Sequence, residues 1–401
     1  MLLLVTKKWF ESRPKKLANL LDGRASVFFA LLLSFIGGVA LLRDTAYQGQ
    51  DFEVCWKAVH HLLSGEPVYD LIRDGAMVYK YPPWIVTVFL PLGFLSVVTA
   101  KWIWGVIELL SLAYVVKWLL RRGYSKRVTA SVGFAFWGIW AVHFMDGQIS
   151  LTILALILWA FDRRQLTVGI WALSSKVFSG FSLLGFPGFL KVSPKQLLLI
   201  GLVLCGLSAP AVFVAPGHSP VSLFHSWSVA ASSGGLLFDG EKVRGRDNQG
   251  MPAMILRTLG IKAANTNADL LFFFICALGL GAYWGLRSKA LNEDERWLGW
   301  IALSTVVHPL AWFHYFVLAF PLAVVSIDAA MKTKNRRMII TGLIALAMVA
   351  LVTRKTLGYT GERMELYSIK SWGVLLFLDL IVMLRRLEKA KFSGLRVVSR
   401  V

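Results

Sequence analysis

The chain has 401 residues, of which 56% are hydrophobic and 16% charged, and its mean hydropathy is +0.61. A soluble globular domain carries roughly 25% charged residues, so this composition excludes an ordinary soluble protein and indicates a polytopic membrane protein. The formal net charge of +20 does not indicate nucleic-acid binding, because no soluble domain is expected to carry such a surface. Three scattered cysteines match neither a disulfide framework nor a metal-ligand pattern.

The order of apolar runs predicts one membrane domain, at residues 26–386, between basic cytoplasmic tails at 1–25 and 387–401. The first run lacks a small-residue cleavage site, which favours a retained helix over a signal peptide. We expect an all-α polytopic membrane protein with about 11 or 12 membrane-spanning helices, ten of which the hydropathy pattern marks. The expected spans lie at 26–43, 100–120, 128–145, 148–161, 197–215, 268–286, 297–309, 312–330, 338–353 and 371–386.

Two apolar stretches are expected not to cross the membrane. Residues 166–190 are interrupted at Ser174-Ser175-Lys176, which favours a hairpin that returns to the same side. Trp84–Val98 is short and contains Pro91, so we expect a half-buried element on the outer side.

The distribution of Lys and Arg then predicts the orientation. They concentrate in short segments on one side, as the positive-inside rule requires. Both termini are therefore expected in the cytoplasm, and the chain in the inner (plasma) membrane. The loops 43–99, 216–267 and 354–370 are expected on the outer, periplasmic face, where such long loops usually bind or act on substrates.

The first outer loop contains Asp51, the most informative residue of the chain. After it, apolar residues recur with helical spacing at Phe52, Cys55, Trp56, Val59, Leu62 and Leu63. A single apolar face is typical of a helix in the plane of the membrane interface. Asp51 would then lie where lipid head groups meet water. The alternative is that Asp51 only caps a helix beginning at Phe52, since Asp is favoured at that position.

Six short motifs agree in order, and in their expected side of the membrane, with a known family. They are Asp51–Trp56 with Leu63–Tyr69, Tyr81-Pro82-Pro83 with Leu90-Pro91-Leu92, Gly147-Gln148, Gly169 with Lys176, Asn248-Gln249 with Arg257, and Pro309 with Trp312 and His314. Together they resemble glycosyltransferase family 87, whose members are GT-C-type mannosyltransferases that use polyprenyl-phosphate-mannose.

The resemblance implies transfer of a sugar, mannose above all, from a polyprenyl-phosphate donor to a hydroxyl of a glycolipid or glycan acceptor. A lipid phosphate leaves without protonation, so one general base and nearby cations suffice. The resemblance makes Asp51 that base, with Glu53 as the alternative, and direct displacement implies inversion at the sugar. No cofactor beyond the donor substrate and no metal is expected, because the outer loops contain no D-x-D pair.

The other matching motifs supply candidate ligands for the donor phosphate and the sugar. They are His314, His308, Arg257, Lys176, Tyr81, Gln148, Asn248 and Gln249. Each has a structural alternative: a buried histidine at a helix end, a lysine that caps the broken hairpin, or polar residues that form turns. Arg244 and Arg246 fit a solvated loop better, and Asp146 is a possible second carboxylate for sugar hydroxyls.

Two other functional classes stay open on this sequence. One is a transporter or flippase of lipid-linked sugars, since broken helices and an intramembrane lysine are transporter features. The other is a polymerase or ligase of surface glycans. In a glycosyltransferase, Asp51, His314 and Arg257 should converge on one outward cavity, with membrane lipids around it.

Overall fold

The computed structural model describes residues 24–186, 192–213, 219–232, 245–260 and 266–398, and all regular structure in these ranges is helical. The amino-terminal part contains α3 (Arg24–Tyr47), α4 (Gln50–Leu63), α5 (Leu71–Asp74), η1 (Gly75–Met77), α6 (Pro83–Gly93), α7 (Val97–Arg121), α8 (Lys126–Ala135), α9 (Trp137–Asp146), α10 (Ser150–Arg163), α11 (Leu166–Ser174) and η2 (Val177–Gly185). The rest contains α12 (Pro194–Phe213), α13 (Pro220–Ser232), α15 (Met251–Thr258), α16 (Thr266–Arg287), η4 (Ser288–Ala290), α17 (Glu293–Val307), η5 (Phe313–Ala319), α18 (Phe320–Thr333), α19 (Arg336–Leu346), η6 (Ala347–Leu351), α20 (Arg354–Leu366) and α21 (Ile369–Val398).

Each expected span corresponds to helical structure. However, fewer helices than expected are long and apolar enough to cross a membrane without a break. Among the described residues, four helices are long and apolar enough, or up to six if two bent pairs are counted, against the expected 11 or so. The pair α8 and α9 bends by 59°, and α10 has only 14 residues. A helix of that length is about 21 Å long, shorter than the hydrocarbon core. Hydropathy counts apolar residues and does not register such breaks.

Burial divides the helices into an outer and a central group. Apolar side chains of α12 and α16, such as Leu198, Leu202, Phe274 and Ile275, are more than half exposed. In contrast, α17 and α18 bury almost every side chain. Large exposed apolar faces around a buried centre are stable only against lipid. The chain is therefore an all-α polytopic membrane protein.

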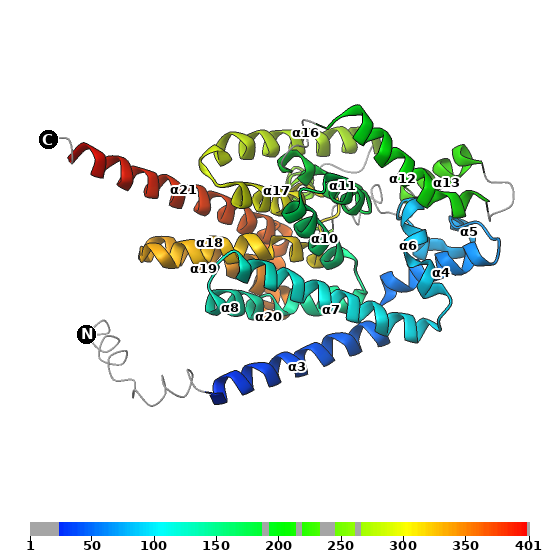
Figure 1. The fold of residues 1–401 in the computed structure, drawn as a ribbon, viewed down its shortest axis with the longest axis horizontal. Helices are drawn as coiled ribbons and strands as arrows, with labels where there is room; N and C mark the ends of the chain where they lie inside the picture. The colour runs from blue at the N-terminus through cyan, green and yellow to red at the C-terminus, as the bar shows by residue number, and fades with distance from the viewer. Residues whose placement is uncertain (1–23, 187–191, 214–218, 233–244, 261–265, 399–401) are drawn as a thin grey trace.

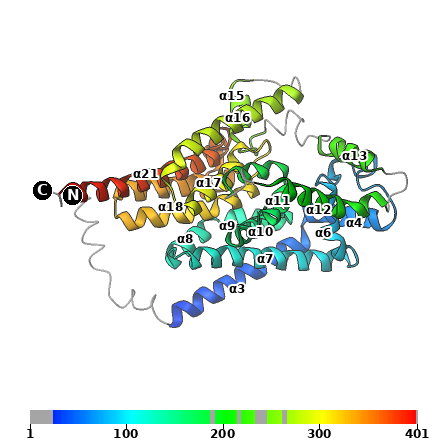
Figure 2. The ribbon, with the colours of Figure 1, turned by 45° about the horizontal axis from the view of Figure 1, so that its top comes forward.

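Figure 1 shows how the two ends of this bundle differ. The helices α4, α5, α6 and α13 lie together toward the right, whereas the start of α3 and the end of α21 lie toward the left, as they also do in Figure 2. The helices of the first expected outer loop and α13 of the second thus gather at the end opposite to the start of α3 and the end of α21.

The amphipathic helix expected after Asp51 is α4, and its apolar face packs against the protein itself. Phe52, Cys55, Val59 and Leu62 are buried, and α6 packs directly onto this face. A Cβ added to Gly93 would lie 2.2 Å from the Cγ1 atom of Val59, so only glycine permits this approach. The short apolar stretch with Pro91 is α6, an 11-residue helix, as the sequence predicts.

Candidate functional site

The site is built where the first turn of α4 meets the turn between α9 and α10. Helix α4 begins at Gln50, and Gly49 takes the N-cap position without a side-chain cap bond. The alternative in which Asp51 caps a helix starting at Phe52 is therefore wrong. Gly147 has φ +69°, and a Cβ there would lie 2.8 Å from the Cβ of Phe52. Glycine thus allows the turn to touch α4 beside Asp51.

Gln148 joins a carboxylate to an ammonium group inside the protein. Its amide nitrogen donates to the Asp51 carboxylate, and its Oε1 accepts from Lys176 Nζ at 2.9 Å. Lys176 also donates to Ser150 Oγ at 2.9 Å and lies 4.1 Å from the centre of the Tyr315 ring. Lys176 is only 7% exposed. A buried cation beside a buried carboxylate is a typical feature of functional sites in membrane proteins.

Two histidines approach the same place from the opposite side. His314 Nδ1 lies 3.2 Å from Asp146 Oδ2, and its ring stacks on Tyr315 at 4.8 Å. The ring of His308 lies 4.4 Å from Tyr315, and its Nδ1 accepts the amide proton of Leu310. Tyr315 thus contacts all three candidate cations. The sequence analysis missed it, although it directly follows His314.

The charges around Asp51 suit a general base. Burial, reinforced by the negative charge of Asp146, raises the pKa of Asp51 from 3.8 to about 6. The charges of Lys176 and Lys80 and the hydrogen bond from Gln148 act in the opposite direction. Lys80 is a second residue that the sequence analysis missed, although it directly precedes Tyr81. A base with a pKa near the working pH is both ionised and able to hold a proton.

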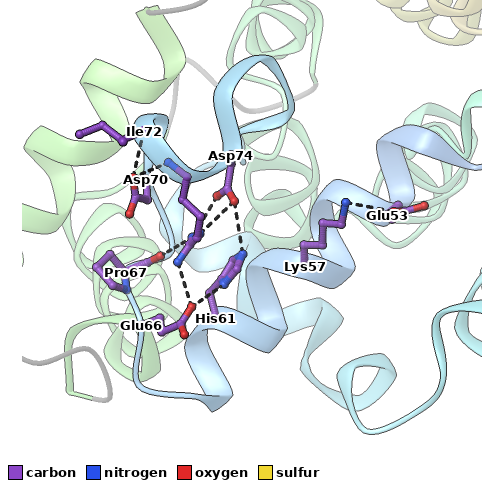
Figure 3. Close-up of polar contacts among 9 residues, drawn as sticks. Glu53, Lys57, His61, Glu66, Pro67, Asp70, Ile72 and Asp74 are labelled. Atoms are coloured by element: carbon purple, nitrogen blue, oxygen red, sulfur yellow. Dashed lines mark hydrogen bonds and ion pairs between the residues drawn. The ribbon is translucent and has the colours of Figure 1, made fainter.

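Glu53, the alternative base, lies in a different environment. Its carboxylate pairs with Lys101 at 2.8 Å and with Lys57 at 3.1 Å, and Figure 3 shows the contact with Lys57. The hydrogen bond from Lys101 lowers the pKa of Glu53. In the same view, Arg73 bonds to Glu66, Asp74 and the Pro67 carbonyl and so holds the loop after α4. The structure therefore separates Glu53 from the cluster around Lys176.

Tyr81 lies next to the Asp51 cluster. Burial raises the pKa of the Tyr81 phenol well above its usual range, with further contributions from Cys55, Tyr315 and Asp51. Its backbone carbonyl accepts from the Tyr69 hydroxyl at 2.8 Å, which keeps the Tyr81 segment in place. Tyr81 thus lies beside the site, and Tyr69 supports its backbone.

The motif of the second outer loop forms a separate polar cluster around Arg257. This guanidinium donates to the backbone carbonyls of Gly245, Asn248 and Leu366 and to Ser368 Oγ, at 2.8–3.0 Å. These bonds use all five of its N–H donors. Burial lowers the pKa of Arg257 to about 10, which leaves it charged at neutral pH. The geometry favours a role in holding loops together over a role in binding phosphate.

Asn248 and Gln249 complete this second cluster. Asn248 donates to the Pro309 carbonyl at 2.5 Å and accepts from the amides of Gly250 and Ala311. Gln249 donates to the carbonyls of Arg246 and Glu365. Arg246 pairs with Glu362, and Arg244 lies outside the described residues. The cluster therefore fixes the segment 308–311 that leads to His314. The hydrogen bonds of Arg257 involve neither Asp51 nor His314.

In the part of the chain that the structure describes, no three His, Cys, Asp or Glu side chains are placed to hold a metal ion together. The site thus consists of a buried carboxylate, a buried ammonium group and histidines at one end of a membrane-embedded helical bundle. This arrangement is typical of a membrane enzyme that handles an anionic substrate at the membrane surface.

Comparison with family models identifies the class of this enzyme. The model of glycosyltransferase family 87 matches residues 79–312, which is more than half of the chain. The chain therefore belongs to glycosyltransferase family 87 and is a membrane glycosyltransferase. The matched region includes Gln148, Lys176 and Arg257, whereas Asp51 precedes it and His314 follows it. Comparisons with curated proteins and with solved structures give no match.

Proposed function

We propose that this protein transfers mannose from a polyprenyl-phosphate donor to a hydroxyl of a glycolipid or glycan acceptor. Asp51 removes the proton of the acceptor hydroxyl as its oxygen bonds to the anomeric carbon. The bond from that carbon to the phosphate oxygen breaks on the opposite face, so the sugar configuration inverts. The products are the glycosylated acceptor and the polyprenyl phosphate, and the proton stays on Asp51 until the solvent takes it up.

The observation that carries this proposal is the contact chain from Asp51 through Gln148 to Lys176. In this chain, a carboxylate and an ammonium group bond to either side of one amide, with 2.9 Å between Lys176 Nζ and Gln148 Oε1. The leaving phosphate needs positive charge and hydrogen-bond donors. In this proposal Lys176 supplies the charge, and the ring N–H of His314 supplies a further donor. The acceptor needs a base that is deprotonated near neutral pH, and the pKa of Asp51 near 6 meets this requirement.

A lipid-borne donor also needs an apolar path beside the site. A cavity of about 310 Å³ lies between α11 and α12, lined among others by Val168, Trp171, Val203 and Leu207. Helix α11 ends at Ser174, two residues before Lys176. An isoprenoid chain lying there would keep its phosphate within reach of Lys176.

The proposed orientation has the site on the outer face of the inner membrane and both termini in the cytoplasm. It rests on the distribution of Lys and Arg and on the position of α4 and α6 at the end opposite to the start of α3 and the end of α21. Family membership favours transfer chemistry over the flippase alternative.

The test is sugar transfer from labelled polyprenyl-phosphate-mannose in membranes that contain the wild type or Asp51→Asn at equal amounts. Loss of a general base costs roughly 100-fold or more in rate, so we expect transfer to fall by at least that factor while donor binding persists. Glu53→Gln is the matched control, because Glu53 lies two residues further along α4 and forms ion pairs outside the cluster. This variant should keep its transfer rate.

Three results would contradict parts of this proposal. Full transfer by Asp51→Asn would remove Asp51 as the base. Loss of transfer by Glu53→Gln alone would move that role to Glu53. If the wild type transfers no mannose but transfers another sugar from a polyprenyl phosphate, the identity of the donated sugar is wrong and the site assignment stands.

A further inference from the structure

A buried carboxylate that the proposed reaction does not use lies in the middle of α7. Glu108 is 1% exposed, and it faces His143 of α9, which is fully buried. Glu108 Oε2 lies 2.8 Å from His143 Nε2, and Glu108 Oε1 accepts from Thr152 Oγ1 of α10 at 2.5 Å. An ionisable residue inside a membrane domain is costly, so its presence calls for a functional reason.

The two partners of Glu108 lie on either side of the turn that carries the site. His143 precedes Asp146 by three residues at the end of α9, and Thr152 follows Gln148 by four residues near the start of α10. One carboxylate thus bridges both helices that flank this turn. Asp146 contacts His314, and Gln148 contacts Asp51 and Lys176.

Helix α7 supports the same turn with one continuous face. Trp104 lies one turn before Glu108, and its Nε1 donates to the Gly147 carbonyl at 3.1 Å. Ser111 lies one turn after Glu108, and its Oγ is 3.1 Å from Thr152 Oγ1. Residues at this spacing share one side of a helix. The side that α7 turns to the α9–α10 junction is therefore polar, although α7 is apolar enough to span a membrane.

The hydrogen bonds of His143 indicate where the protons lie in the Glu108–His143 pair. His143 Nδ1 is buried and has no hydrogen-bond partner. A proton on this nitrogen would be an unsatisfied buried donor, whereas a proton on Nε2 donates to Glu108. A neutral His143 beside an ionised Glu108 satisfies every buried donor of this pair. Glu108 thus keeps its negative charge, and this charge is among those that stabilise the ammonium form of Lys176.

We propose that Glu108, acting through His143 and Thr152, is a positioning residue that holds the α9–α10 turn, and with it Asp146 and Gln148, in the geometry required for transfer. It does not touch the donor or the acceptor. This inference rests on the proposed function, because that function gives the turn its role. Misplacement of reacting groups by about 1 Å costs roughly 100-fold in rate, so removing such a support lowers kcat without changing the groups that bind the donor.

The experiment compares Glu108→Gln, Glu108→Ala and Thr152→Val with the wild type, in the full chain in detergent. It measures kcat, the KM for polyprenyl-phosphate-mannose, and hydrogen exchange of the peptide that covers 143–152. We expect kcat to fall between about 10- and 100-fold for Glu108→Ala and less for the other two variants. The KM should remain that of the wild type, and exchange in 143–152 should increase.

Glu295→Gln is the matched control. Glu295 is also a fully buried glutamate, but it pairs with Arg385 and closes the capping box of α17. We expect this variant to unfold more easily and to keep the kcat of the wild type. A merely structural Glu108 would behave in the same way, so a selective fall in kcat separates the two roles.

Unchanged kcat in both Glu108 variants would overturn the proposal, as would unchanged exchange in 143–152. If Glu108→Ala does not fold, Glu108→Gln decides by the same criteria. If the wild type does not use this donor, the proposed function fails, but the exchange measurement still decides: increased exchange confined to 143–152 supports the positioning role, and unchanged exchange overturns it.

Discussion

The cluster around Asp51 and the cluster around Arg257 both consist of buried polar residues from recognisable motifs, yet they bond to different partners. Asp51, Gln148 and Lys176 bond to one another through their side chains. Arg257 directs four of its five hydrogen bonds to backbone carbonyls, and Asn248 and Gln249 likewise bond to backbone groups.

This difference in bonding distinguishes a cluster that can bind substrate, around Asp51, from a cluster that holds loops in place, around Arg257. Side chains that bond to one another can exchange a partner for a substrate group while the backbone keeps its shape. A side chain that satisfies backbone carbonyls cannot leave them without exposing unsatisfied acceptors, each of which costs about 1–3 kcal/mol when buried. Lys176 is therefore the better candidate for the donor phosphate, and Arg257 is the better candidate for holding the loop.

Among changes that distinguish the two clusters by donor binding, the largest effect is expected from Lys176→Gln, because the donor phosphate loses a charged hydrogen-bond donor. Hydrogen bonds to charged groups contribute about 1.5–3 kcal/mol, so the KM for the donor should rise between about 10- and 100-fold. Lys370→Gln is the matched control: Lys370 is also a buried lysine, 4.0 Å from the centre of an aromatic ring, Phe313. Its ammonium donates to the Val349 and Val352 carbonyls.

Lys370→Gln should lower the unfolding temperature and leave the KM for the donor unchanged. Steady-state kinetics at several donor concentrations, with thermal unfolding in detergent, measure both quantities. Equal increases in KM for the two lysine variants would remove the distinction between the clusters.

A smaller effect, on kcat/KM, is expected when the pH falls. The pKa of Asp51 is raised to about 6, so below this pH the carboxylate becomes protonated and kcat/KM should fall about tenfold per pH unit. Protonation of a carboxyl group whose pKa is raised by folding favours the folded state as the pH falls. Titration of Asp51 therefore lowers activity without unfolding the protein, which kcat/KM and circular dichroism between pH 5 and pH 8 can test. A pH-independent rate over this range would exclude Asp51 as the base.

The smallest effect on catalysis is expected from Arg257→Gln, although its effect on stability should be large. Loss of bonds to three buried carbonyls should destabilise the protein by about 2–4 kcal/mol, while the folded fraction keeps its donor KM. Arg246→Ala removes a partly exposed ion pair with Glu362 and should cost less than about 1 kcal/mol. Denaturation of purified protein measures both. If Arg257→Gln raised the KM for the donor without changing stability, Arg257 would have to be assigned to donor binding.

Much of the fold was predictable because local patterns carry it. The apolar spacing after Asp51 predicted α4 and its buried face, and Pro91 within a short apolar run predicted α6 as a short element. The break at Ser174-Ser175-Lys176 predicted the change from α11 to η2. In each case, the information lies within one or two helical turns of the residue concerned.

The site was only partly predictable, because residues far apart in the chain build it. The motifs indicated Asp51, Gln148, Lys176 and His314, but their spacing contains no information on which side chains bond. The sequence analysis missed Glu108 and His143, although an ionisable residue inside an expected span is itself a signal. Its partner across the helices is known only from the packed structure.

By itself, the sequence determined that this protein lies in a membrane and which segments are helical, because these depend on the local cost of exposing apolar or polar groups. Only the tertiary structure decided that Asp51 meets Gln148 and not its own helix end, that Arg257 bonds to the backbone, and that α8 and α9 bend by 59°. These outcomes depend on which buried donors and acceptors satisfy one another across helices, and that pairing exists only after the helices have packed.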